Sequence, residues 1–257
     1  MKKLVFLLLI ITSVTGCTKI IDVDLKNAAS QLVIEATVTN SSPAQVNILK
    51  TVQFSSINNF PAVSGAVVTI TDNAGGNFTL AETSAGTYTN SSLIGVPGRM
   101  YTMNVLLNGT NYTATSTMPL QVNLDSLLLE NIAFIPDNIW IVKPKYTDPD
   151  GFGNYYRFIK KINNVRNPAI WVFDDRLTNN GVSTRPLIQA DSAINLGDTL
   201  EVEMQCIDRN TFRYFTVLQN LQFNSTTPTN PDTNISGNVL GYFSAHTSQK
   251  KKVEVKL

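Results

Sequence analysis

Two clusters of carboxylates are the residues of this sequence whose type and spacing could do chemistry. The first is the segment Asp148-Pro-Asp-Gly-Phe-Gly-Asn154, whose oxygens could hold a hard cation. It departs from a calcium-binding loop, because two acids instead of three precede Gly151 and Ile159 stands where the bidentate glutamate belongs. We therefore favour a turn between two strands, with Asp148 and Asp150 as candidate ligand-binding residues.

The second cluster is Asp174-Asp175-Arg176, which directly follows Trp171-Val-Phe173. Two neighbouring aspartates at a strand end could act as acid and base, or bind a polar ligand beside Trp171. The commoner outcome is an Asp–Arg pair that is satisfied within its own loop. Trp140, Trp171, Asp174, Asp175 and Arg176 complete the candidate ligand-binding set. Binding residues concentrate on loops, so we expect the contact surface near residues 140, 148–156, 171–176 and 224–237.

The number of histidines and the absence of known motifs argue against most other catalytic sites. His246 is the only histidine and no Gly-x-Ser-x-Gly elbow is present, which argues against His-rich zinc sites and serine triads. The chain also lacks the glycine-rich loops that bind nucleotides. A balance of 20 Lys+Arg against 19 Asp+Glu predicts no nucleic-acid surface. We expect no catalytic residue, metal or cofactor, and we interpret His246 as a surface or edge residue.

The first seventeen residues resemble an export signal that ends in a lipidation site. Lys2 and Lys3 precede a short apolar run over residues 4–11, too short to span a membrane. Val14-Thr15-Gly16-Cys17 then has the pattern of a lipobox, which predicts a signal peptide over 1–16 and an acylated Cys17. Two or three acyl chains would anchor the protein stably. An ordinary secretory signal with a chance cysteine is the alternative.

Cys206, the second cysteine, has no partner for a disulfide once Cys17 is acylated. It alternates with charged residues in Leu200-Glu-Val-Glu-Met-Gln-Cys206, which places it on the inward face of a strand. A buried structural thiol is therefore the favoured interpretation.

The mature chain is predicted to be mostly β, with an Ig-like β-sandwich over 31–120 after a lipidated lead-in over 17–30. Seven strand signals broken by Gly, Asn and Pro support this, and Asn108-Gly109 is typical of a tight hairpin. Residues 121–257 are predicted to form a second β-rich domain. Its one helix, near 208–223, would be capped by Asp208.

Six segments carry a family resemblance: residues 17–25, 63–75, 86–98, 148–158, 173–177 and 234–243. Together they resemble a domain-of-unknown-function family of outer-membrane lipoproteins that are encoded beside TonB-dependent receptors. The front half also resembles the transthyretin-like, carboxypeptidase-regulatory β-sandwich. The resemblance implies a lipid-anchored protein of the Gram-negative outer membrane that accompanies an uptake receptor. It leaves open whether the chain faces the periplasm or the cell surface.

These observations favour a non-enzymatic accessory or ligand-capture lipoprotein, whose partners are the membrane, a TonB-dependent receptor and an unidentified small ligand. A structural or adhesive envelope module is the alternative, and a carboxylate-based hydrolase is a third. Three Asp-Ser/Thr-aliphatic triplets also make Ser126, Ser192 and Thr199 candidate O-glycosylation sites.

Overall fold

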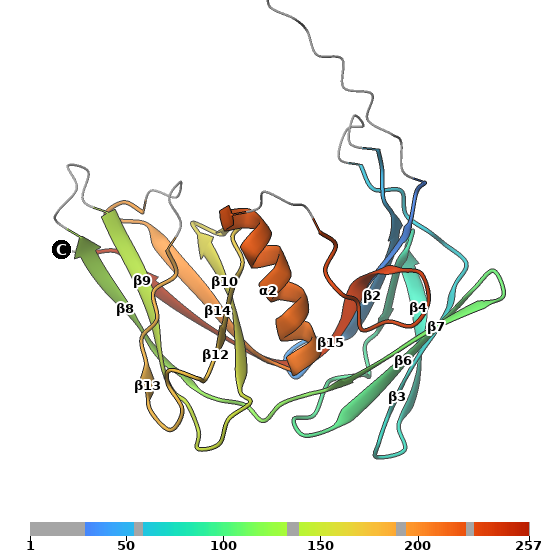
Figure 1. Cartoon of the computed structure of the whole chain (residues 1–257), viewed down its shortest axis with the longest axis horizontal. Coiled ribbons are helices and arrows are strands. Elements are labelled where there is room, and N and C mark those ends of the chain that lie inside the picture. The colour runs from blue at the N-terminus through green and yellow to red at the C-terminus, as the bar shows by residue number, and fades with distance from the viewer. Residues whose placement is uncertain (1–28, 54–58, 133–138, 189–193, 225–228, 257) are drawn as a thin grey trace, which may run out of the picture.

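The structure, a computed structural model, describes residues 29–53, 59–132, 139–188, 194–224 and 229–256. In this part of the chain, strands dominate and one helix is present, which confirms the mostly β prediction (Figure 1). Among these residues no helix is both long and apolar enough to cross a membrane. Cys17 and the lipobox residues lie outside the described residues.

The N-terminal half is one sheet that folds over on itself like a sandwich. The strands pair in the order β1-β2-β5-β4-β3-β6-β7, and β7 returns to contact the last strand of the chain. Their bounds are β1 Leu32–Thr39, β2 Ala44–Lys50, β3 Val67–Asp72, β4 Asn77–Ser84, β5 Thr87–Asn90, β6 Met100–Leu107 and β7 Thr110–Thr117.

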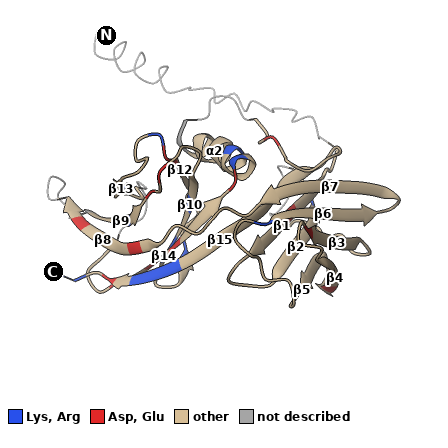
Figure 2. Cartoon of the chain, turned by 90° about the horizontal axis from the view of Figure 1, so that it is seen from below, with Lys and Arg blue, Asp and Glu red and all other residues tan. Residues whose placement is uncertain are grey.

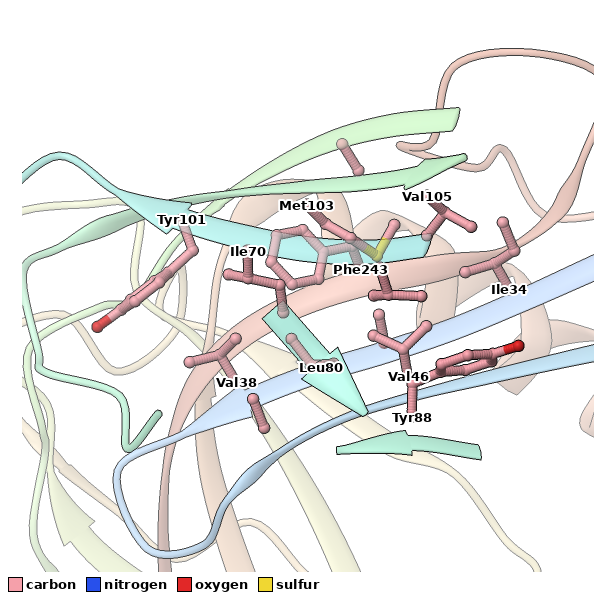
Figure 3. Packing of buried hydrophobic residues seen from close by; sticks show 14 of the residues in the cluster. Ile34, Val38, Val46, Ile70, Leu80, Tyr88, Tyr101, Met103, Val105 and Phe243 are labelled. Carbon is pink, nitrogen blue, oxygen red and sulfur yellow. The ribbon is translucent and has the colours of Figure 1, made fainter. Parts of the chain in front are cut away.

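Alternate residues of these strands point inward and form the core of this half. Ile34, Ala36 and Val38 of β1 point inward and are fully buried, as are Tyr101 and Met103 of β6. Figure 3 shows side chains of β1 and β6 packed together with Phe243 from the far end of the sequence; those labelled from the two strands include Ile34, Val38, Tyr101 and Met103. Full burial of each large apolar side chain contributes about 1.5–3 kcal/mol.

The hairpin between β6 and β7 confirms the prediction made from Asn108-Gly109. Both residues have positive φ, 50° and 79°, which an asparagine and a glycine adopt with little cost. The two strands pair in continuous register from Met100↔Thr117 to Leu107↔Thr110.

The C-terminal half has three layers. The middle sheet contains β10 (Tyr155–Ile162), β14 (Thr199–Ile207) and β15 (Leu240–Glu254), with β11 (Val165–Arg166) and β12 (Trp171–Asp174) beside β10. A smaller sheet of β8 (Leu124–Ile132), β9 (Ile139–Thr147) and β13 (Val182–Ser183) covers one face, and helix α2 (Arg209–Asn224) covers the other.

Successive residues of β10 and β14 face opposite sides of the middle sheet. Tyr156, Phe158 and Cys206 face the smaller sheet, whereas Tyr155 and Ile207 face α2. Cys206 is 3% exposed and unpaired, which confirms the buried thiol.

Helix α2 begins as predicted. Asp208 accepts a hydrogen bond from the backbone N–H of Thr211 at 2.8 Å through Oδ1, and its Oδ2 accepts one from the Ser116 hydroxyl at 2.5 Å. The same carboxylate therefore caps the helix and ties it to β7 of the N-terminal half.

Strand β15 belongs to both halves of the molecule (Figure 1). Its first part pairs in parallel with β1, from Val33↔Leu240 to Thr39↔His246, and its second part pairs antiparallel with β14. Ile235, Phe243 and Ala245 consequently lie in the N-terminal core. The division at residue 120 thus does not anticipate that the end of the chain completes the first sandwich.

His246 corrects the sequence interpretation. The side chain is 3% exposed, not at a surface or edge, because β15 is an interior strand that pairs with β1 up to residue 246 and with β14 from residue 247 onward. Burial lowers the pKa of its imidazole to about 4, so the ring is neutral at pH 7.

Candidate functional site

A groove of about 350 Å³ lies between the turn after β9, the end of β12 and the first turns of α2. It brings together residues that are far apart in the sequence: Phe152, Gly153, Tyr155, Asp174, Asp175, Arg176, Arg209, Phe212 and Arg213. Six of these nine fall in the predicted ranges 148–156 and 171–176. This groove is the candidate ligand-binding site.

Asp175 holds the turn that forms one wall of the groove. Its Oδ2 accepts hydrogen bonds from the backbone N–H groups of Gly153 at 2.7 Å and Asn154 at 2.8 Å. The side-chain amide of Asn154 also donates to it at 3.3 Å. The turn needs positive φ at Gly153, 111°, which only glycine adopts readily. Asp175 is 2% exposed, so its main role is to position this loop.

Asp148 lies beneath the turn and is fully buried. The hydroxyl of Tyr156 donates a hydrogen bond to its Oδ1, while Oδ2 has no hydrogen-bond partner among the described residues. Burial raises the pKa of this carboxyl, and the nearby charge of Asp175 adds to the rise. Asp148 does not line the groove, and neither does the exposed Asp150.

Asp174 and Arg176 form the ion pair expected within their loop. Arg176 Nε lies 2.6 Å from Asp174 Oδ2, although the Arg176 side chain is 80% exposed. Exposed pairs of this kind contribute little to stability, about 0–1 kcal/mol. Arg176 therefore remains available at the mouth of the groove.

Arg209 and Arg213 are site residues that were not predicted from the sequence. They lie one turn apart on α2, are exposed, and form no ion pair within the described part of the chain. Figure 2 shows basic residues on α2. Their spacing in a predicted helix is a visible signal, but it does not reveal which loop they face. With Arg176 they outnumber Asp174 and Asp175, so the groove is net positive.

Aromatic side chains supply the apolar part of the groove. Tyr155 and Phe212 stack with ring centroids 4.7 Å apart, and Phe152 is 75% exposed at the rim. A cationic mouth beside a flat apolar wall suits a ligand that carries both an anionic group and an apolar or planar part.

The two tryptophans do not belong to this groove. Trp171 is 3% exposed in the core between the two sheets, where its indole N–H donates to the Ile188 carbonyl at 3.0 Å. Trp140 packs half-buried against the same core. Both strands turn these rings toward the apolar interior, so neither ring lines the groove.

The carboxylates do not form a shared catalytic cleft. Of the four, Asp174 and Asp175 line the groove, while the buried Asp148 and the exposed Asp150 do not. Among the described residues, no group of three His, Cys, Asp or Glu side chains is arranged to hold a metal ion.

The candidate O-glycosylation sites lie apart from the groove. Ser126 is half-buried on β8 and Thr199 is exposed at the start of β14. Ser192 lies outside the described residues.

The fold and the groove define a β-rich, sandwich-like protein with one helix and a cationic, aromatic loop-end groove. The chain belongs to the domain-of-unknown-function family DUF4249, whose model matches residues 18–252. A comparison with curated proteins finds no match.

Proposed function

We propose that this protein is an outer-membrane lipoprotein, anchored through Cys17, that captures a small ligand for a TonB-dependent uptake receptor without catalysing a reaction. The signal and lipobox over residues 1–17 support the anchor. The resemblance to receptor-associated lipoproteins supports the partner.

The observation that carries the proposal is the groove between α2 and the β9–β10 turn. Arg209 and Arg213, which have no ion pair within the described ranges, lie in this groove with the exposed Phe152 and offer binding contacts. We favour binding over hydrolysis because both aspartates already have partners. Asp175 accepts hydrogen bonds from the loop backbone, and Asp174 forms an ion pair with Arg176. A structural or adhesive module would need no such groove.

Replacing Cys17 with serine should move the protein from the membrane to the soluble envelope fraction. A hydroxyl does not accept the diacylglyceryl group, so the chain loses the acyl chains that hold it to the bilayer. Fractionation at physiological salt and mass spectrometry of the N-terminal peptide measure the change. Cys206→Ser is the control and should stay in the membrane fraction. A wild-type peptide with an unmodified Cys17 would refute the anchor.

Receptor capture is tested by purifying the anchored protein in mild detergent and identifying what co-purifies. A TonB-dependent receptor should be recovered with the wild type. The double variant Arg209→Gln/Arg213→Gln should recover about tenfold less, because we assign the exposed arginines and aromatic rim of the groove to the receptor contact as well as to the ligand.

The matched control is Lys50→Gln/Lys251→Gln, which removes the same charge from exposed positions outside the groove and should leave recovery unchanged. Recovery of no receptor with the wild type would favour a structural or adhesive role. Equal loss in both double variants would indicate general electrostatics instead of the groove.

A further inference from the structure

A second groove, of about 520 Å³, lies on the face of the middle sheet that also carries α2. Its floor is formed by β10, β14, β15 and β1, and one wall is the turn at Ser41 and Ser42. The pairing register aligns Arg157 with Gln205 and Gln205 with Ser248 across three strands, and places His246 opposite Thr39. None of these residues belongs to the first groove.

The floor of this second groove is polar and deeply placed. Arg157 is 9% exposed, Gln205 5%, His246 3% and Ser248 9%. A sheet face with so little exposure is ordinarily apolar. The opposite face of β15 follows that rule with Phe243 and Ala245. Buried polar side chains need hydrogen-bond partners, and a polar ligand bound in the groove would supply them.

Arg157 is the buried cation of the floor, whose lining also includes Glu203 and the more exposed Lys250. Its guanidinium lies 3.7 Å from the centroid of the Phe215 ring and donates to Gln205 Oε1 at 3.2 Å. The guanidinium also shares a side-chain hydrogen bond with Tyr242. Within the described residues Arg157 forms no ion pair, although a guanidinium has five N–H donors. A buried charge without an ionic partner is rare unless something binds to it.

The neighbouring Glu203 is already satisfied. Its Oε1 accepts from Gln205 Nε2 at 2.7 Å and from the Ser248 hydroxyl at 2.8 Å, and its Oε2 lies 3.6 Å from Lys250 Nζ. Glu203 therefore does not consume the donors of Arg157. Its negative charge nevertheless disfavours a dianion in the groove, since like charges repel strongly where water is excluded.

The rim adds hydroxyl groups. Thr37, Thr39, Ser41 and Ser42 line the groove on the β1 side. The lining combines these neutral hydrogen-bonding groups with Arg157 and Lys250 against Glu203, a net charge of +1 that matches a single negative charge on a ligand. We propose that this groove binds a small hydroxylated monocarboxylate, such as a sugar acid, with the carboxylate on Arg157 and the hydroxyls toward the Ser/Thr rim. The proposal requires neither the receptor nor the first groove.

The lone histidine provides a direct reporter of this groove. The full lipidated chain in detergent, labelled at histidine, gives imidazole signals from His246 only. Titration with galacturonate should shift these signals and saturate. Galactose, which lacks the carboxylate, should bind at least tenfold more weakly. Galactose 6-phosphate, a dianion near neutral pH, should also bind more weakly than galacturonate.

Two variants assign the site. Arg157→Gln should weaken galacturonate at least tenfold, as expected for loss of a charged hydrogen-bond donor. Ser41→Trp fills the groove from its exposed rim without altering the floor, and should abolish the shift even if Arg157→Gln does not fold. Arg209→Gln, in the first groove, is the control and should bind galacturonate as the wild type does.

The proposal is overturned if galacturonate leaves the His246 signals unchanged, if galactose binds as tightly, or if the phosphate binds more tightly. Undiminished binding by Ser41→Trp would also overturn it. Failure of receptor capture with retained galacturonate binding would leave this inference standing and refute only the proposed function.

Discussion

Gly241→Ala should destabilise the protein by about 4 kcal/mol or more, which places it among the exceptional single substitutions. Gly241 has φ 102° at the point where β15 runs beside β1. A β-carbon there would lie 2.0 Å from the carbonyl oxygen of Ile34 and 2.7 Å from its carbonyl carbon. Backbone atoms cannot swing aside as a side chain does, so β15 would have to leave β1. The change is measured as a shift in the denaturant midpoint.

Gly75→Ala is the matched control for this prediction. Gly75 has a similar φ of 90°, but nothing lies within 4 Å of an added β-carbon. The Gly75→Ala variant should lose about 1–2 kcal/mol of unfolding free energy, which is the cost of positive φ for a residue with a β-carbon. Equal midpoints for the two variants would show that backbone conformation, and not the approach of β1, sets the effect.

Acidification from pH 7.5 to pH 5 should remove about 2 kcal/mol of unfolding free energy through His246 alone. Burial, with the charge of Arg157 as a further cause, lowers the pKa of this ring from 6.5 to about 4. The unfolded chain therefore binds a proton below about pH 6.5, whereas the folded chain does so only near pH 4. The contribution is complete above the unfolded pKa and is lost as the pH falls toward the folded one.

The chain offers a clean control, because His246 is its only histidine. His246→Gln should show a flatter pH dependence between pH 7.5 and 5, and the comparison at each pH cancels carboxyl groups such as Asp148. Imidazole signals of the folded protein should not titrate above pH 5. An ordinary titration near pH 6.5 would contradict the burial argument.

Local patterns predicted the elements that depend on neighbours in sequence. The Asn108-Gly109 hairpin, the Asp208-capped helix and the inward Cys206 follow from turn geometry, capping and period-two alternation. Each signal spans a few residues, and tertiary packing agrees with it.

The candidate site was predicted in part. Asp174, Asp175 and Arg176 lie together in the first groove, because they share one loop. Trp171 lies outside the groove because the smaller sheet covers its face of the strand, and alternation alone does not tell which of two sheet faces is covered. Arg209 and Arg213 were missed because a helix pattern does not specify the loop it packs beside.

By itself, the sequence determined the β-rich class, the single helix, the turn residues and the expected export signal, since each is encoded in a short stretch of chain. Only the tertiary structure decided that β15 completes the first sandwich, that His246 is buried, and that Arg157 shares a polar groove with β1 and β15. Parallel pairing between residues some 200 positions apart has no local sequence signal, because its free energy is gained only when the whole sheet forms.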